Sequence, residues 1–363
     1  MLLQHHYRLV GSPIEAPGKD SFGDVDILVL DPLPSSPLNG IIPSRELAAQ
    51  LATLLGAKHH ILEKGNPTMN FAIPWPRCSP SSSPLLQEEK YIQLDLKVCE
   101  SEKMYNWELF HAAHGDLWNI LGSTIRKFGL TVNNLGMYLR IPEIEALDRR
   151  KSMIFLTDDH KKILEFIGLE PEKWWKEFDN REDMFEYAAG CRMFWVKDLE
   201  EEISEVGENV SEALGSIEGQ QGGEKGKKVL KHNDRARMVK RPIFREWIDE
   251  FIPKCRAEGR YTRSKGVTRE QVRDEAFATF GSKVVEVYKS RLSEWKLARH
   301  TDEVWWTAIK GNVSEDVDPQ FRAASIRTLK GVVMGGKEFD GMVVPEVARN
   351  EEVSHFEYFG TSK

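Results

Sequence analysis

Residues 7–12 read Tyr-Arg-Leu-Val-Gly-Ser, and after a short interval residues 24–30 read Asp-Val-Asp-Ile-Leu-Val-Leu. The first stretch predicts a strand that ends in a Gly-Ser turn, and the second predicts an apolar strand that opens with two carboxylates. Side chains alternate faces along a strand, so we expect Asp24 and Asp26 to share one face while the intervening apolar residues share the other. Two like charges side by side repel unless a cation lies between them, which favours a metal site.

A third carboxylate lies in a later predicted strand. Residues 91–98 read Tyr-Ile-Gln-Leu-Asp-Leu-Lys-Val, so apolar residues alternate with Gln93, Asp95 and Lys97. Asp is unfavourable in the middle of a strand unless it has a partner. If this strand lies beside the first acidic strand, Asp95 completes a cluster of three carboxylates. Such a cluster can hold two Mg²⁺ (or Mn²⁺) ions about 3.5–4 Å apart for in-line phosphoryl transfer.

Together these motifs resemble those of the nucleotidyltransferase superfamily, the group that contains DNA polymerase beta, CCA-adding enzymes and poly(A) polymerases. The shared pattern is a strand ending in Gly11-Ser12, then an Asp-x-Asp strand, then a lone Asp in a later strand. The resemblance covers roughly residues 5–100. It implies a mixed-sheet palm, two Mg²⁺ ions, and transfer of a nucleoside monophosphate from an NTP to a hydroxyl. Many relatives begin a helix directly after Gly-Ser, but Pro13 and Pro17 predict a loop here.

The resemblance also assigns roles to individual side chains. The Asp-x-Asp pair would hold both metals, Asp95 would bind the catalytic metal near the attacking hydroxyl, and Gly11 and Ser12 would support the triphosphate. Lys97 shares a face with Asp95 and is a candidate nucleotide contact. Each feature has a structural alternative: a solvated strand edge for the acids, a plain hairpin turn for Gly-Ser, and a solvated lysine. Glycosyltransferases also use Asp-x-Asp, but usually where an apolar strand ends rather than where it begins.

Size and composition indicate a globular protein. At 363 residues, with 40% hydrophobic and 10% aromatic residues, the chain is long enough for two domains. Its four cysteines lack CxxC spacing, so we expect neither a zinc motif nor a disulfide framework, and an intracellular location, cytoplasmic or nuclear. No signal-like pattern opens the sequence and no apolar run approaches ~18 residues, so we expect no membrane partner.

The patterns along the chain predict an α+β fold, with a nucleotidyltransferase-like mixed β-sheet palm followed by mainly α-helical parts. The palm is expected over residues 1–105 in the order strand, strand, helix and three strands. Residues 106–200 predict a helical extension that completes the nucleotide cleft. Residues 201–233, first acidic and then rich in Gly and Lys, predict a flexible linker. Residues 234–363 predict a basic, mainly helical domain.

Local signals place two of the helices. Ser44 and Gly56 predict the start and the end of the helix in the palm. Apolar spacing predicts a single helix over residues 106–127. His111 and His114 would lie one turn apart on that helix and could bind a metal, but a surface or core role is the better interpretation without the acidic base of a metalloprotease motif.

Charge is unevenly distributed. The formal net charge is −7, yet residues 225–300 contain 21 Lys and Arg against 10 Asp and Glu. This asymmetry predicts a basic segment attached to an acidic body. Guanidinium groups pair well with phosphate, although a solvated helix start would have the same composition. The candidate track for RNA or another single-stranded nucleic acid contains Arg235, Arg237, Lys240, Arg241 and Arg245.

The sequence therefore predicts a Mg²⁺-dependent nucleotidyltransferase that binds an NTP and modifies the 3′ end of an RNA or another nucleic acid. One alternative is a catalytically silent module that binds nucleotides or nucleic acids. The intact acidic trio argues against this module, because a silent site need not keep its charges. Another alternative keeps the chemistry and changes the acceptor to a protein or a small molecule.

Overall fold

The computed structural model describes residues 2–19, 22–38, 42–76, 89–196, 241–262 and 266–311. It confirms the α+β class, with a five-stranded sheet, a three-stranded sheet and helices. The chain divides into two compact units, Met1–Leu139 with Phe155–Thr279, and Arg140–Ile154 with Phe280–Lys363. The predicted linker lies outside the described residues. The predicted domain boundaries near residues 105 and 200 stay predictions, since the first unit includes both the expected palm and the region that follows it.

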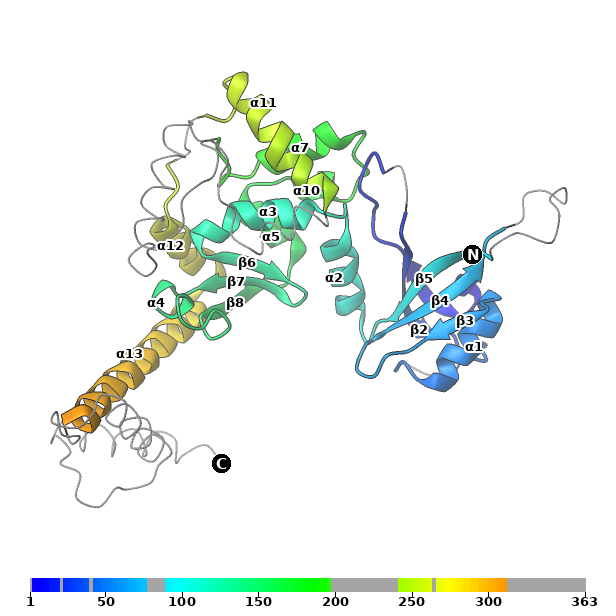
Figure 1. The fold of residues 1–363 in the computed structure, drawn as a ribbon, viewed down its shortest axis with the longest axis horizontal. Helices are drawn as coiled ribbons and strands as arrows, with labels where there is room; N and C mark the ends of the chain where they lie inside the picture. The colour runs from blue at the N-terminus through cyan, green and yellow to red at the C-terminus, as the bar shows by residue number, and fades with distance from the viewer. Residues whose placement is uncertain are drawn as a thin grey trace, which may run out of the picture. The chain divides into compact units, whose positions relative to one another are not determined.

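The first unit contains a mixed five-stranded sheet in the order β1-β2-β5-β4-β3 (Figure 1). Strands β2 and β5 are parallel, and the other three neighbouring pairs are antiparallel. The predicted order of strand, strand, helix and three strands is confirmed. The elements are β1 (Tyr7–Gly11), β2 (Val25–Pro32), α1 (Arg45–Leu55), β3 (His59–Ile61), β4 (Thr68–Pro74) and β5 (Tyr91–Val98).

Helix α1 begins and ends where its capping residues predict. The Leu47 backbone N–H donates to Ser44 Oγ at 3.1 Å, which satisfies one of the free donors of the first turn. Gly56 ends the helix in the left-handed conformation, with a φ of 65° that a residue with a side chain adopts at a cost. The buried face of α1 packs against one face of the sheet, through Leu47, Ala48, Leu51 and Ala52.

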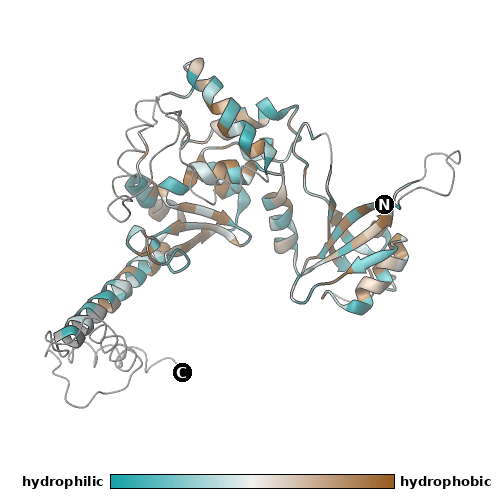
Figure 2. Cartoon of the chain, in the orientation of Figure 1, coloured by the Kyte–Doolittle hydropathy of each residue, from teal (hydrophilic) through white to brown (hydrophobic). Residues whose placement is uncertain are grey.

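The central strands have two different faces. Val29 and Leu96 pack toward α1, whereas Leu28 and Leu30 pack with Tyr105 of α2 (Glu102–Ala112). Figure 2 shows the resulting mixture of brown and teal residues along the strands. Because side chains alternate, Asp26 lies on the same face as Leu28, which is the face toward α2. The alternation predicted from the sequence is therefore confirmed.

The prediction of one helix over residues 106–127 is wrong. Two helices, α2 and α3 (Leu117–Ile125), are separated by His114 and Gly115, which both have a φ of 59°. A right-handed helix cannot continue through left-handed residues. His111 and His114 therefore do not lie on one helix, and His114 instead packs in the core, with its Nε2 2.6 Å from the Trp174 carbonyl oxygen.

The state of His114 makes stability depend on pH. Its Nε2–H donates to a carbonyl and its Nδ1 is buried with no partner among the described residues, so the neutral ring fits and the protonated ring does not. Burial lowers the pKa of His114, an effect only partly opposed by the bond to Trp174, and burial likewise lowers the pKa of His111. As the pH falls below about 6.5, the two histidines therefore become protonated in the unfolded chain before they do so in the folded protein.

We expect the free energy of unfolding to fall between pH 7 and pH 5.5, and to fall less steeply in His114→Asn. Asn tolerates the left-handed backbone at this position but does not titrate in this range. Urea unfolding at several pH values measures the slope. The control is His5→Asn, at an exposed position, which should keep the wild-type slope. An unchanged slope in His114→Asn would contradict this account.

The region after the palm also contains a three-stranded sheet that the sequence analysis did not predict, in the order β6-β7-β8. Its strands are β6 (Leu130–Asn133), β7 (Gly136–Arg140) and β8 (Met153–Thr157). The short helices in this stretch of the sequence are α4 (Pro142–Glu145), α5 (His160–Ile167), α6 (Pro171–Trp174) and α7 (Arg181–Ala189).

From residue 241 onward the described chain is mainly helical, as predicted. The segments are α10 (Pro242–Glu246), a π-helical turn (Trp247–Phe251), α11 (Ile252–Ala257), α12 (Arg269–Phe280) and α13 (Ser282–Gly311). In the second unit, Arg291 of α13 donates to the Met153 carbonyl at 2.6 Å. Over the described part of the chain, no helix combines the length and the apolar character that a membrane crossing requires.

Candidate active site

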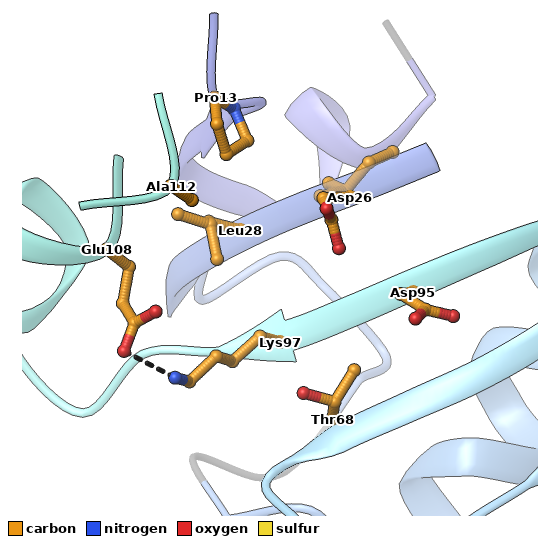
Figure 3. Close-up of a pocket in the computed structure, with 9 residues that line it drawn as sticks. Pro13, Asp26, Leu28, Thr68, Asp95, Lys97, Glu108 and Ala112 are labelled. Carbon is orange, nitrogen blue, oxygen red and sulfur yellow. Dashed lines mark hydrogen bonds and ion pairs between the residues drawn. The ribbon is translucent and has the colours of Figure 1, made fainter. Parts of the chain in front are cut away.

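The parallel pairing of β2 with β5 brings two of the three predicted acidic residues, Asp26 and Asp95, together. Asp26 and Asp95 are direct register partners on these strands, and Asp24 immediately precedes β2. Asp24 and Asp26 are exposed and Asp95 is half-buried. Figure 3 shows Asp26 and Asp95 on neighbouring strands, lining one pocket. The strand pairing on which the three-carboxylate hypothesis depends is thus present.

The electrostatics of Asp26 show that the carboxylates influence one another. Partial desolvation raises the pKa of Asp26, and the negative charges of Asp24, Asp95 and Glu15 raise it further, while Lys19 lowers it. The net direction is upward, so the ionised form of Asp26 is disfavoured in the folded protein. A cation at this position would reverse that penalty. Glu15 and Lys19, which form an ion pair with each other, come from the loop after β1.

The pocket beside these acids is small. Its volume is about 150 Å³. A cavity needs about 10–15 Å³ of this kind of volume to hold one water, so the pocket has room for several waters or for a phosphate group. The polar side chains that line it are Asp26, Thr68, Asp95, Lys97 and Glu108.

Lys97 forms an internal ion pair and is not a solvated lysine. Its Nζ lies 2.5 Å from Glu108 Oε1 of α2, and the two side chains are only 17% and 21% exposed (Figure 3). A largely buried ion pair is costly to break when only one partner is removed. The same ammonium lines the pocket with Asp26 and Asp95, where a phosphate could compete with Glu108 for it. The predicted role of Lys97 as a nucleotide contact stays a prediction.

Gly11 has a packing reason that the sequence did not reveal. A Cβ added at Gly11 would overlap the hydroxyl of Tyr105 in α2, with Leu109 close behind. This close approach favours glycine whether or not a triphosphate binds. Ser12 is exposed and starts a loop without regular structure, as Pro13 and Pro17 predict. The proposed support of a triphosphate by Gly11 and Ser12 stays a prediction.

Sequence reasoning missed Asn70 and Glu108, and it gave no role to Gln93, although it placed Gln93 on the same face as Asp95. Asn70 and Gln93 donate to Asp95 Oδ1, at 2.6 and 3.0 Å, and Glu108 pairs with Lys97. A signal for Asn70 was present, because a polar residue between two apolar ones in the Thr68–Phe71 stretch must lie on the polar face of its strand. Glu108 had no such signal, since its partner is reached only through the packing of α2.

The predicted nucleic-acid track is only partly described. Arg235, Arg237 and Lys240 lie outside the described residues. Arg241 is paired within the chain, with its guanidinium 2.6 Å from Asp116 Oδ1, and Arg245 is exposed on α10. Of the two described arginines in this track, Arg241 therefore pairs with a carboxylate of the same chain.

Farther along the same segment, Arg260 also forms ion pairs within the chain. It pairs with Glu186 and with Glu258, the latter at 2.7 Å. The Lys254 ammonium lies 2.9 Å from Glu182. The excess of positive charge counted in the sequence is thus partly neutralised by acidic residues of other elements.

Comparison with known proteins does not assign a family: no protein-family model matches the sequence, and no curated protein matches it. In the described ranges, no group of three His, Cys, Asp or Glu side chains is arranged to hold a metal ion. The case for a function therefore depends on the geometry of the acidic strands.

Proposed function

We propose that this chain is a Mg²⁺-dependent nucleotidyltransferase that transfers a nucleoside monophosphate from an NTP to a hydroxyl acceptor. The observation that carries the proposal is the register pairing of Asp26 with Asp95 across parallel strands, with Asp24 two residues before Asp26. Strand alternation directs the side chains of this pair to one face of a mixed sheet. The resemblance of the motifs to the nucleotidyltransferase superfamily supports the same function.

Asp26 and Asp95, which line the same pocket, supply oxygen donors of the kind that Mg²⁺ takes. This ion prefers oxygen ligands and is commonly held by one or two carboxylates together with waters and substrate phosphates, so a protein need not preassemble the whole coordination shell. Desolvation, and then neighbouring carboxylates, raise the pKa of Asp26, and a bound cation would offset this penalty on its ionised form. Asp24, Asp26 and Asp95 would hold the ions. When bound, they would neutralise charge on the α-phosphate and lower the pKa of the acceptor hydroxyl.

The other pocket residues would bind and orient the reacting groups. Lys97 is positioned by Glu108 beside the acidic strands, where its ammonium can contact phosphate oxygens. The pocket volume of about 150 Å³ leaves room for a phosphate group.

For the acceptor, we propose the 3′ end of an RNA or another nucleic acid, on the basis of the positive charge after residue 225. A second candidate, a protein or a small-molecule hydroxyl, is favoured by the ion pairs that engage Arg241 and Arg260 within the chain. Binding to nucleic acid should weaken steeply with salt, because released counterions drive it. Transfer that is insensitive to salt would favour the second candidate.

The direct test is to incubate the protein with each labelled NTP, Mg²⁺ and a mixed RNA pool, with parallel reactions that lack RNA. Label in RNA supports the first acceptor class, and label in the protein or in a small product supports the second. Thermal unfolding with Mg²⁺ and a non-hydrolysable NTP reports binding separately, since a ligand at 100 times its Kd stabilises by about 2.7 kcal/mol. The catalytically silent module would be favoured if the protein binds the NTP equally well without the Asp95 carboxylate and transfers no NMP.

A further inference from the structure

Asp95 is held by two amides on one of its two oxygens. Asn70 Nδ2 donates to Oδ1 at 2.6 Å, and Gln93 Nε2 donates to the same Oδ1 at 3.0 Å. An ionised carboxylate only accepts hydrogen bonds, so each amide must present its nitrogen here. Within the described residues, no donor is bonded to Oδ2. The two oxygens of Asp95 are therefore not equivalent.

The fold explains why Asn70 can reach this carboxylate. Strand β4 pairs antiparallel with β5, and Asn70 is the direct register partner of Asp95, just as Asp26 is on the other side. Met69 and Phe71, which flank Asn70, are buried in the core beneath α1. Because successive side chains alternate, burial of these neighbours directs Asn70 to the face that carries Asp95.

We infer that Asn70 and Gln93 are positioning residues that restrain Asp95 through Oδ1 and leave Oδ2 as the oxygen for the metal ion. This inference rests on the proposed function. Outer partners of this kind orient a ligand before the metal arrives, so less conformational freedom is lost on binding. Asn70 is half-buried and makes the shorter bond, whereas Gln93 is exposed, so Asn70 contributes the larger share.

The test compares Asn70→Leu and Gln93→Leu in the full chain. Each substitution replaces the amide by an apolar side chain of roughly similar size. Binding of Mn²⁺ alone is measured by electron paramagnetic resonance, and NMP transfer is measured as a function of Mg²⁺. We expect Asn70→Leu to weaken Mn²⁺ binding about 10- to 100-fold, the range for outer partners of metal ligands, and Gln93→Leu to have a smaller effect in the same direction. The KM for NTP at saturating Mg²⁺ should stay within about twofold, by the same reasoning.

Controls separate positioning from packing and from the proposed function itself. Asn119→Leu makes the same chemical change on α3 and should leave Mn²⁺ binding unchanged. If Asn70→Leu does not fold, Gln93→Leu at its exposed position still tests the inference. Wild-type Mn²⁺ affinity in both amide variants, while Asp95→Asn abolishes binding, would overturn the positioning role alone. Wild-type Mn²⁺ affinity in Asp95→Asn would overturn the proposed metal site and the inference with it.

Discussion

Replacing Asp26 by Asn is expected to abolish NMP transfer and to leave the folded protein at least as stable as the wild type. Loss of an outer partner of a metal ligand typically costs 10–100-fold in activity, so loss of a ligand itself should cost more than about 100-fold. Asn keeps the shape of Asp26 and one carbonyl oxygen, which isolates the effect of the charge.

The expected gain in stability follows from the sign of the pKa shift. Partial desolvation, and then the charges of Asp24, Asp95 and Glu15, raise the pKa of Asp26 in the folded protein. A carboxyl whose pKa is raised by folding destabilises the folded state wherever it is ionised, which includes neutral pH. A neutral side chain removes this penalty. Added Mg²⁺ should then stabilise the wild type and have little effect on the variant.

The measurements are NMP transfer from labelled NTP and thermal unfolding with and without Mg²⁺, at neutral pH. The matched control is Asp31→Asn, in the same strand but at its other end, where Asp31 pairs with Arg8 at 2.8 Å. This control should keep full activity. Transfer that persists in Asp26→Asn at the wild-type rate would rule out the proposed role of the acidic strands.

Gly11→Ala is expected to destabilise the protein by about 1–3 kcal/mol, the usual cost of overpacking a filled site. The added methyl group would overlap the Tyr105 hydroxyl, and Tyr105 is itself buried between α2 and the sheet. In Gly11→Ala combined with Tyr105→Phe, the hydroxyl is gone; of the next contacts, the one at 3.5 Å is ordinary and the one at 3.3 Å requires the ring to shift by only a few tenths of an ångström. Most of the lost stability should therefore return.

Urea unfolding of the wild type, both single variants and the double variant gives the coupling energy between the two positions. Gly122→Ala is the matched control, because a Cβ there meets nothing within 4 Å and Ala favours the helix that contains it. Additive effects of the two substitutions would contradict the packing explanation. If Gly11 also approaches a triphosphate, the stable double variant should still show a raised KM for NTP.

Local elements of the fold could be predicted because their determinants lie within a few residues of one another. Alternating polarity defined the acidic faces of residues 24–30 and 91–98, and Ser44 and Gly56 marked the ends of α1. The prediction failed at His114, where the apolar spacing of a helix continued but the backbone did not. The turn there is held by a hydrogen bond from the His114 N–H to the Ile14 carbonyl, at 2.6 Å and 100 positions earlier in the chain.

The sequence by itself determined which side chains share a face of each strand, since that depends only on the backbone repeat of two residues. Only the tertiary structure decided which strands are neighbours, and so which polar groups meet: Asp26 and Asn70 on either side of Asp95, Glu108 on Lys97, and Tyr105 against Gly11. These contacts join segments that are distant along the chain. They form because burying both faces of the sheet, against α1 and α2, outweighs any local preference.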